Sequence, residues 1–115
     1  MSIKQINIKQ IIPHIKKPWV PVVLGKVEDY EVRLVMFKGE YFWHKHEQHD
    51  EFILIYKGSI AIELKGGKEI KLSAGEGALI EKGTLHRSKA AKKALAVVFE
   101  RETITGDFVK AENPN

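Results

Sequence analysis

The sequence predicts an all-β fold, a barrel or sandwich of short strands, and three observations support this prediction. Runs rich in β-branched and aromatic residues recur through most of the chain. Glycine-containing turns separate these runs at short and fairly regular intervals. No long segment with helical periodicity lies between the runs, which argues against an α/β fold.

The first segment differs from the rest because its apolar residues have helical spacing. Isoleucines recur at three- and four-residue intervals from Ile8 to Ile15. Asn7, followed three residues later by Gln10, resembles a capping box. Pro13 should end any helix there, so we expect a short N-terminal helical segment of roughly one or two turns.

Strand-like runs follow Pro18, and glycine residues end many of them. We expect strands at residues 20–24, 30–37, 41–46, 51–57, 59–64, 69–72, 78–81, 84–88 and 95–101. The segment Lys65-Gly66-Gly67-Lys68 is a strong hairpin signal. The tail from Gly106 to Asn115 is polar, and we expect its last residues to be disordered.

The chain has 115 residues and no cysteine. This length fits a single domain, residues 1–115. The lack of cysteine excludes disulfides, thiolate metal sites and a cysteine nucleophile. No signal peptide is visible, and no apolar stretch approaches the roughly 20 residues that span a bilayer. We therefore expect a cytoplasmic protein that does not contact a membrane.

The formal net charge of +4 raises the question of nucleic-acid binding. The lysines are scattered, however, and the tight pairs are Lys16-Lys17 and Lys92-Lys93. No basic run is interleaved with aromatic residues. We interpret the charge as a solvated lysine surface and expect no nucleic-acid partner.

The segment from His44 to Glu51 carries the strongest chemical signal. His44 and His46 are two residues apart, so on a strand they share one face, with Cα atoms roughly 6–7 Å apart. Two imidazoles placed this way can meet at one metal ion. Glu51 begins the next predicted strand, and a hairpin would bring its carboxylate beside them. Such a set is common for iron, manganese, zinc or nickel.

His86 is a further candidate that comes much later in the chain. It follows the turns at Gly75-Glu76-Gly77 and Gly83. A barrel can pair a late strand with an early one, so the distance in sequence is no objection. The spacing alone does not bring His86 to the other histidines.

At this point the residues match a family, because the segment resembles the first cupin motif. That motif runs glycine, several residues, His-x-His, three or four residues, glutamate, six residues, glycine. Here the motif reads Gly39, His44, His46, Glu51 and Gly58. The six-residue gap before the last glycine fits, and the first gap of four residues is one shorter than usual.

The second cupin motif also has a counterpart. It reads Gly75, Glu81, Gly83, His86 and Ala90, with glutamate where proline is usual and alanine where asparagine is usual. The two motifs lie within residues 39–90. A tryptophan before the His-x-His and a late Thr-Gly-Asp at residues 105–107 are similar to small bacterial single-domain cupins, often labelled mannose-6-phosphate-isomerase-like.

The resemblance implies a double-stranded β-helix, or jelly-roll, barrel. It implies one divalent metal ion (iron, manganese, zinc or nickel) held by His44, His46, Glu51 and His86. It also implies a small-molecule ligand or substrate and a homodimer. The activity expected is that of a metal-dependent isomerase or dioxygenase on a small oxygenated compound, sugar-like or of diol or enol type. The alternative is a non-catalytic small-molecule-binding or sensory cupin, and no catalytic acid or base is evident.

Several neighbouring residues have two interpretations. His49 and Asp50 are interpreted as a solvated turn, and His49 becomes an alternative ligand if the strand register differs by a residue or two. By alternation, Trp43 faces away from the metal and packs on the outer side of the sheet or at a subunit contact. Phe42 and Phe52 are core or pocket residues, and Phe42 is the better pocket candidate because it shares the ligand face.

The candidates for binding an anionic substrate are Arg33, Arg101 and Tyr30. The sequence does not show whether their side chains point into the barrel or out of it. Glu81, near the expected mouth of the barrel, is interpreted as a solvent-facing turn residue.

Overall fold

The computed structural model describes residues 2–102 and 106–115, which form nine strands and two short helical turns. The helical turns are α1 (Ile8–Ile11) and η1 (Ile12–His14). The strands are β1 (Val22–Val27), β2 (Tyr30–Glu40), β3 (His44–His46), β4 (Glu51–Lys57), β5 (Ser59–Leu64), β6 (Glu69–Ser73), β7 (Gly77–Ile80), β8 (His86–Arg101) and β9 (Phe108–Lys110).

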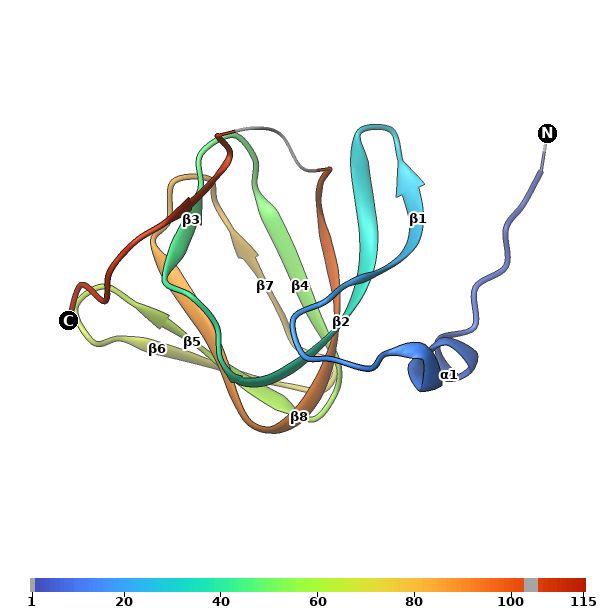
Figure 1. The fold of residues 1–115 in the computed structure, drawn as a ribbon, viewed down its shortest axis with the longest axis horizontal. Helices are drawn as coiled ribbons and strands as arrows, with labels where there is room; N and C mark the ends of the chain where they lie inside the picture. The colour runs from blue at the N-terminus through green and yellow to red at the C-terminus, as the bar shows by residue number, and fades with distance from the viewer. Residues whose placement is uncertain (1, 103–105) are drawn as a thin grey trace.

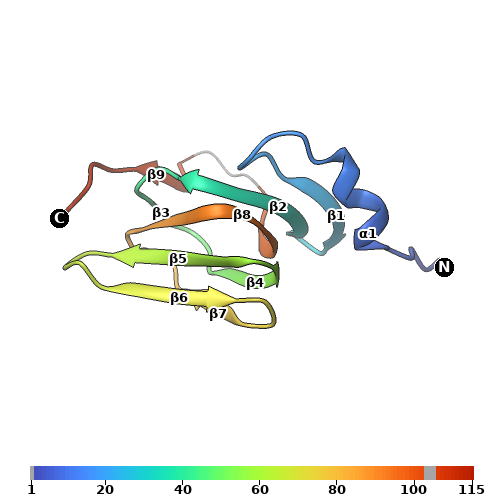
Figure 2. The same ribbon diagram turned by 90° about the horizontal axis from the view of Figure 1, so that it is seen from below.

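Strand β8 is the centre of the fold. Its first residues pair antiparallel with β5, its later residues pair with β4, and β2 runs along both parts. One wall is therefore β6–β5–β8 and the other is β7–β4–β8. Figures 1 and 2 show the strands curling around a common interior, with α1 outside it beside β1. This confirms the predicted double-stranded β-helix barrel.

Alternation along the strands creates the core between the walls. In β4, Ile53 and Ile55 are each 1% exposed, whereas Phe52 and Leu54 point outward. The same pattern places alternate residues of β5 and β8 inside, because successive side chains of a strand face opposite ways. The central cluster is Val35, Phe37, Ile53, Ile55, Ile60, Ile62, Leu72, Ile80, Ala90, Ala94, Ala96 and Val98.

The predicted strands at 84–88 and 95–101 are one continuous strand in the structure. The chain between them is Lys89-Ala90-Ala91-Lys92-Lys93-Ala94, where the register with β2 shifts between Phe37 and Gly39. Small side chains allow close approach here: a Cβ on Gly58 would lie 3.1 Å from the Lys93 carbonyl oxygen. The turn residue Gly58 has a φ of +85°, so the β4–β5 turn packs directly against β8.

The two ends of the chain differ in detail from expectation. The helical segment is confirmed, but Asn7 makes no side-chain cap and no residue of α1 or η1 is buried. The last residues of the tail were expected to be disordered, but β9 pairs with β3 just before them, and the Asn115 side chain donates to the Leu64 carbonyl and accepts from the Gly66 N–H. The strand expected at 41–46 begins only at His44. Among the described residues, no helix has the length and apolar character needed to cross a membrane.

Candidate metal centre

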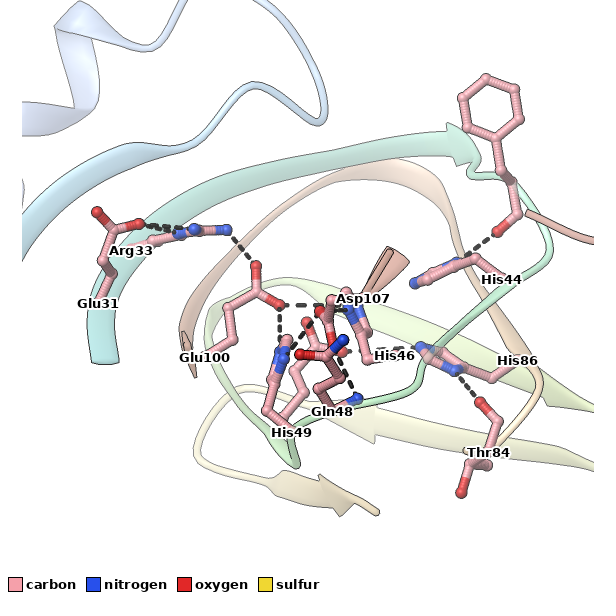
Figure 3. A network of polar contacts seen from close by, with 12 residues as sticks. Glu31, Arg33, His44, His46, Gln48, His49, Thr84, His86, Glu100 and Asp107 are labelled. Atoms are coloured by element: carbon pink, nitrogen blue, oxygen red, sulfur yellow. Dashed lines mark hydrogen bonds and ion pairs between the residues drawn. The ribbon is translucent and has the colours of Figure 1, made fainter. Parts of the chain in front are cut away.

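The structure brings the four predicted ligands to one cavity of about 380 Å³. Strand β3 is positioned by later strands: His44 lies opposite His86 of β8, and His46 lies opposite Phe108 of β9. Glu51, the first residue of β4, faces the same cavity. His44, Glu51 and His86 are all buried, and His46 is partly buried. Figure 3 shows His44 and His46 of β3 with His86 of β8.

Two of the histidines are oriented by the backbone just before them. His44 Nδ1 lies 2.7 Å from the Phe42 carbonyl oxygen, and His86 Nδ1 lies 2.9 Å from that of Thr84. A carbonyl oxygen only accepts, so each Nδ1 must carry the proton and donate it. In a neutral imidazole this leaves the lone pair on Nε2, the atom that a metal requires.

His46 is oriented by a carboxylate instead. Its Nδ1 lies 3.1 Å from Oδ2 of Asp107. The other oxygen, Oδ1, accepts the Gln48 N–H at 2.8 Å, and the Asp107 carbonyl accepts the Glu47 N–H at 2.9 Å. Burial raises the pKa of Asp107, but the contacts with His46 and Gln48 outweigh it and hold the pKa below its ordinary value. Asp107 is therefore an ionised orienting group for His46.

The protonation states in the cavity suit a metal. Burial, followed by the charge of His86, lowers the pKa of His44 to about 4. Burial of Glu51 raises its pKa, but contacts with His86 and His46 outweigh burial and leave the pKa lowered. Glu51 Oε1 lies 3.7 Å from His86 Nε2, and the His44 and His86 ring centroids are 4.4 Å apart. A neutral imidazole and an ionised carboxylate thus share one small volume, and these are the protonation states that a divalent cation requires of its ligands.

A second donor group overlaps the first. Ligand atoms of His46, His49 and Glu100 lie within 4.8 Å of one another. His49 Nε2 is 3.6 Å and His46 Nε2 is 3.8 Å from Glu100 Oε2. His49 is 4% exposed, so its interpretation as a solvated turn residue is wrong, whereas Asp50 is exposed as expected. His49 Nδ1 lies 2.9 Å from Asp107 Oδ2, but neither ring nitrogen has an aligned hydrogen-bond partner.

Glu100 is a buried acidic residue that the sequence reasoning missed. Burial and the Glu51 carboxylate raise its pKa to about 8, although Arg33 opposes the shift. Arg33 forms an ion pair with Glu100 and also donates to Glu31 at 2.6 and 2.9 Å. Arg33 is therefore already occupied by two carboxylates rather than free for an anionic substrate. The signal for Glu100 was present in β8, where Ala96 and Val98 alternate inward and Glu100 continues the series.

The aromatic predictions need correction. Phe42 is 53% exposed and carries the Lys110 ammonium 3.9 Å from its ring centre, and Phe52 is 41% exposed on the outer face. Neither residue lines the cavity or the core. Strand alternation does not extend back to Phe42, because β3 starts at His44. Trp43 is 4% exposed and packs near the Arg87 guanidinium, so it is already covered within the chain.

The aromatic residues that do line the cavity were not singled out by the sequence. They are Trp19, Phe37, Tyr41 and Phe108. They come from the N-terminal segment, β2, the β2–β3 connection and β9, so only the folded chain brings them together.

The structure is a small curled β-barrel with a histidine-lined cavity and a His-x-His strand. A family model described as Cupin domain matches residues 33–100 of this chain. The matched segment is more than half of the chain and includes all four predicted ligands. The chain therefore belongs to the cupin family.

Individual relatives agree with this assignment. The chain is 31% identical over 99 residues to the uncharacterized protein YdbB of Bacillus subtilis, covering 86% of this chain and 88% of YdbB. It is 30% identical to a cupin-2 domain containing protein of Shewanella frigidimarina, with a TM-score of 0.81, covering 84% and 94%. Hydroquinone 1,2-dioxygenase PnpCD shares the fold, with 23% identity, a TM-score of 0.71 and coverage of 84% and 72%.

Proposed function

We propose that this cupin holds one divalent metal ion, namely iron, manganese, zinc or nickel, through His44, His46, Glu51 and His86. The observation that carries the proposal is the shared orientation of the three imidazoles. Each directs its Nδ1 proton to a fixed acceptor, which is the Phe42 carbonyl, the Thr84 carbonyl or the Asp107 carboxylate. Each therefore offers Nε2 as a lone pair, as metal-binding histidines commonly do.

The overlapping group of His46, His49 and Glu100 is less suited to hold the ion. Arg33 engages one oxygen of Glu100, so that carboxylate already has a cationic partner. Glu51 lines the cavity with Oε1 3.7 Å from His86 Nε2, and its lowered pKa favours the ionised form that a divalent cation requires. We therefore place Glu51 at the metal and His49 and Glu100 beside it.

The function we infer is that of a metal-dependent enzyme acting on a small oxygenated compound, as an isomerase or a dioxygenase. When bound, an ion of this kind supplies Lewis-acid or redox chemistry to an oxygen-bearing substrate. Glu100 also lines the cavity, and burial beside the Glu51 carboxylate raises its pKa, so it is the cavity carboxyl that most readily takes up a proton. The shared fold with a hydroquinone dioxygenase supports the idea that such a barrel can host this chemistry.

A non-catalytic ligand-binding or sensory cupin is the second candidate. Its support is the absence of a free base among the described cavity carboxylates. Glu51 is committed to the proposed metal, Glu100 to Arg33, and Asp107 to His46. An enzyme would turn over compounds from isomerase or dioxygenase panels once loaded with metal. A sensor would bind a ligand without consuming it.

The metal proposal is tested by elemental analysis of protein purified without a metal-affinity tag. We expect about one equivalent of one divalent metal per chain. The matched control is the double variant His44→Ala/His86→Ala, which should contain almost none. Equal metal content in the two proteins would show that the ligand assignment is wrong. No metal in the wild type, even after incubation with each ion, would favour the non-catalytic candidate.

We also propose that the protein is a cytoplasmic homodimer. Support comes from the outer face of β4 and β7, where Phe52 and Leu79 lie directly opposite and are 41% and 63% exposed, with Leu54 nearby at 38%. Exposed apolar patches of this kind are common at subunit contacts. Light scattering of the wild type should give the mass of two chains, and Leu79→Glu should give the mass of one. A wild-type monomer at micromolar concentration would contradict the proposal.

A further inference from the structure

Three aromatic side chains from distant parts of the sequence meet beside the proposed metal ligands. They are Trp19 from the N-terminal segment, Tyr41 from the β2–β3 connection and Phe108 from β9, and we call them the aromatic collar. All three line the metal cavity, yet none is fully buried. Their partial exposure means that solvent, and hence an entering molecule, can reach part of each side chain.

The backbone holds Trp19 in an unusual conformation. Its φ is +69°, in the left-handed region that a bulky residue rarely adopts. The turn lies between Pro18 and Pro21, and the Trp19 N–H donates to the Met36 carbonyl at 2.9 Å. Strained residues of this kind tend to cluster at ligand sites. The turn thus holds the indole in the cavity wall, with its ring centroid 4.8 Å from that of Phe37, rather than leaving it on a free tail.

The rings of the collar contact one another and also contact His44, one of the proposed metal ligands. The Trp19 and Tyr41 ring centroids are 4.9 Å apart, and the Tyr41 and His44 centroids are 5.2 Å apart, edge to face. Phe108 is stacked on His44, with centroids 4.8 Å apart and ring planes 25° apart. A molecule whose oxygen reaches the histidines can therefore pack against these aromatic rings.

The shape and chemistry of this space select one kind of ligand. The cavity of about 380 Å³ lies within the usual range for small-molecule sites. Its lining combines the three rings of the collar with His44, His46, Glu51 and His86. Flat rings gain offset-stacked or edge-to-face contacts that a puckered saturated ring cannot reproduce.

We propose that the aromatic collar binds a small flat aromatic compound that carries an oxygen donor, such as a carboxylate or a hydroxyl group. The ring lies in the collar and the oxygen points toward the histidines. The inference rests on the proposed metal function for the anchoring of that oxygen, whereas recognition of the ring depends on the collar itself. The two parts can therefore be tested separately.

The test compares benzoate with cyclohexanecarboxylate, which has the same anionic group on a saturated ring. Calorimetric titrations use the full chain in a metal-free form and in a zinc-loaded form, since zinc is redox-inert. We expect benzoate to bind at least about fivefold more tightly in both forms, the scale of an aromatic pair. The zinc form should bind both acids more tightly than the metal-free form.

Variants assign the preference to the collar. Trp19→Leu and Tyr41→Leu should each remove most of the preference for benzoate, whereas Trp19→Phe should keep it. Phe52→Leu is the matched control, because Phe52 is an aromatic residue exposed on the outer face of the barrel. A second measurement uses Trp43→Phe, which leaves Trp19 as the sole tryptophan of the two in the chain. Benzoate should then change the Trp19 emission, and cyclohexanecarboxylate should not.

The outcomes separate the two proposals. Equal affinity for the two acids in both metal forms would overturn the aromatic collar as a ring-binding site, whatever metal the protein holds. A preference for benzoate that survives in Trp19→Leu and Tyr41→Leu would overturn it as well. A collar-dependent preference in a protein that takes up no metal would support the collar and overturn the metal proposal.

Discussion

Asp107 Oδ2 lies 3.1 Å from Nδ1 of His46 and joins the C-terminal segment to β3 across 61 residues of sequence. The same carboxylate accepts the Gln48 N–H, and β9 pairs with β3 directly after it. His44 and His86 need only a backbone carbonyl two residues earlier. His46 is therefore the histidine whose orientation depends on a distant side chain, as Figure 3 shows.

We predict that Asp107→Asn weakens zinc or cobalt binding about tenfold, because an orienting carboxylate fixes the tautomer and raises the basicity of its histidine. Competition with a chromophoric chelator measures the affinity. Asp50→Asn is the control, since it removes the same charge from an exposed loop carboxylate that accepts the Lys82 N–H. Equal affinities in the two variants would mean that Asp107 does not tune the metal site.

The second prediction separates the two overlapping donor groups. His44→Ala should abolish stoichiometric metal binding, whereas His49→Ala should retain about one equivalent with less than tenfold loss of affinity. His49 is close to Glu100 and Asp107 but lies outside the proposed ligand set. Elemental analysis and titration of both variants provide the measurement. The reverse result, metal kept without His44 and lost without His49, would assign the ion to His46, His49 and Glu100.

The third prediction concerns pH and the metal-free protein. The pKa of Glu100 rises from 4.5 to about 8 on folding, because of burial and the nearby Glu51 carboxylate. Between these values the folded state binds more protons than the unfolded state, so the free energy of unfolding decreases as pH rises. The lowered pKa of His44 has the opposite effect and makes the free energy of unfolding increase with pH. This effect acts mainly below pH 6.5, the ordinary pKa of histidine.

We therefore expect the free energy of unfolding to fall by roughly 1–2 kcal/mol between pH 6.5 and pH 8, and Glu100→Gln to remove most of this decrease. Urea denaturation at several pH values in the presence of a chelator measures the effect. Glu47→Gln is a suitable control because that glutamate is exposed and pairs with Lys45 on the surface. A variant with the same slope as the wild type would rule out Glu100 as the buried acid.

The fourth prediction concerns the turn between β4 and β5. Gly58→Ala should lower the free energy of unfolding by about 2–4 kcal/mol, from the left-handed backbone and a new contact with β8. Gly66→Ala is the matched control, because Gly66 has a φ of +91° and Gly58 a φ of +85°. The Cβ added at Gly66 would have no neighbour within 4 Å. It should cost only about 1 kcal/mol. Equal losses in the two variants would mean that β8 yields to the extra methyl group.

The sequence was informative where a motif and the strand period coincide. His44 and His46 share a face because they are two residues apart on a real strand, and Glu51 faces inward with Ile53 and Ile55. His86 was expected from the second motif, and the structure places it opposite His44. These relationships depend on local spacing and on one long-range pairing that the motif encodes.

The sequence was uninformative where tertiary pairing overrides local composition. The polar tail contains β9 because β3 has a free edge to pair with, which composition does not reveal. Phe42 was placed on the ligand face by extending the strand period to a residue that is not in a strand. Trp19 is brought to the cavity by a turn with positive φ, a conformation that no sequence pattern predicts for tryptophan.

Strand β3, three residues long, also has a consequence for the order of folding. Both of its neighbours, β8 and β9, come later in the chain, whereas β5 and β6 form a local hairpin closed by Gly66 and Gly67. Local pairs close quickly, and non-local ones wait for loop closure. The amides of His44, Lys45 and His46 should thus gain protection from exchange after those of β5 during pulse-labelled refolding, and simultaneous protection would contradict this order. The two histidines of the proposed ligand set would then become ordered only after the local hairpin, so metal uptake would report on a late stage of folding.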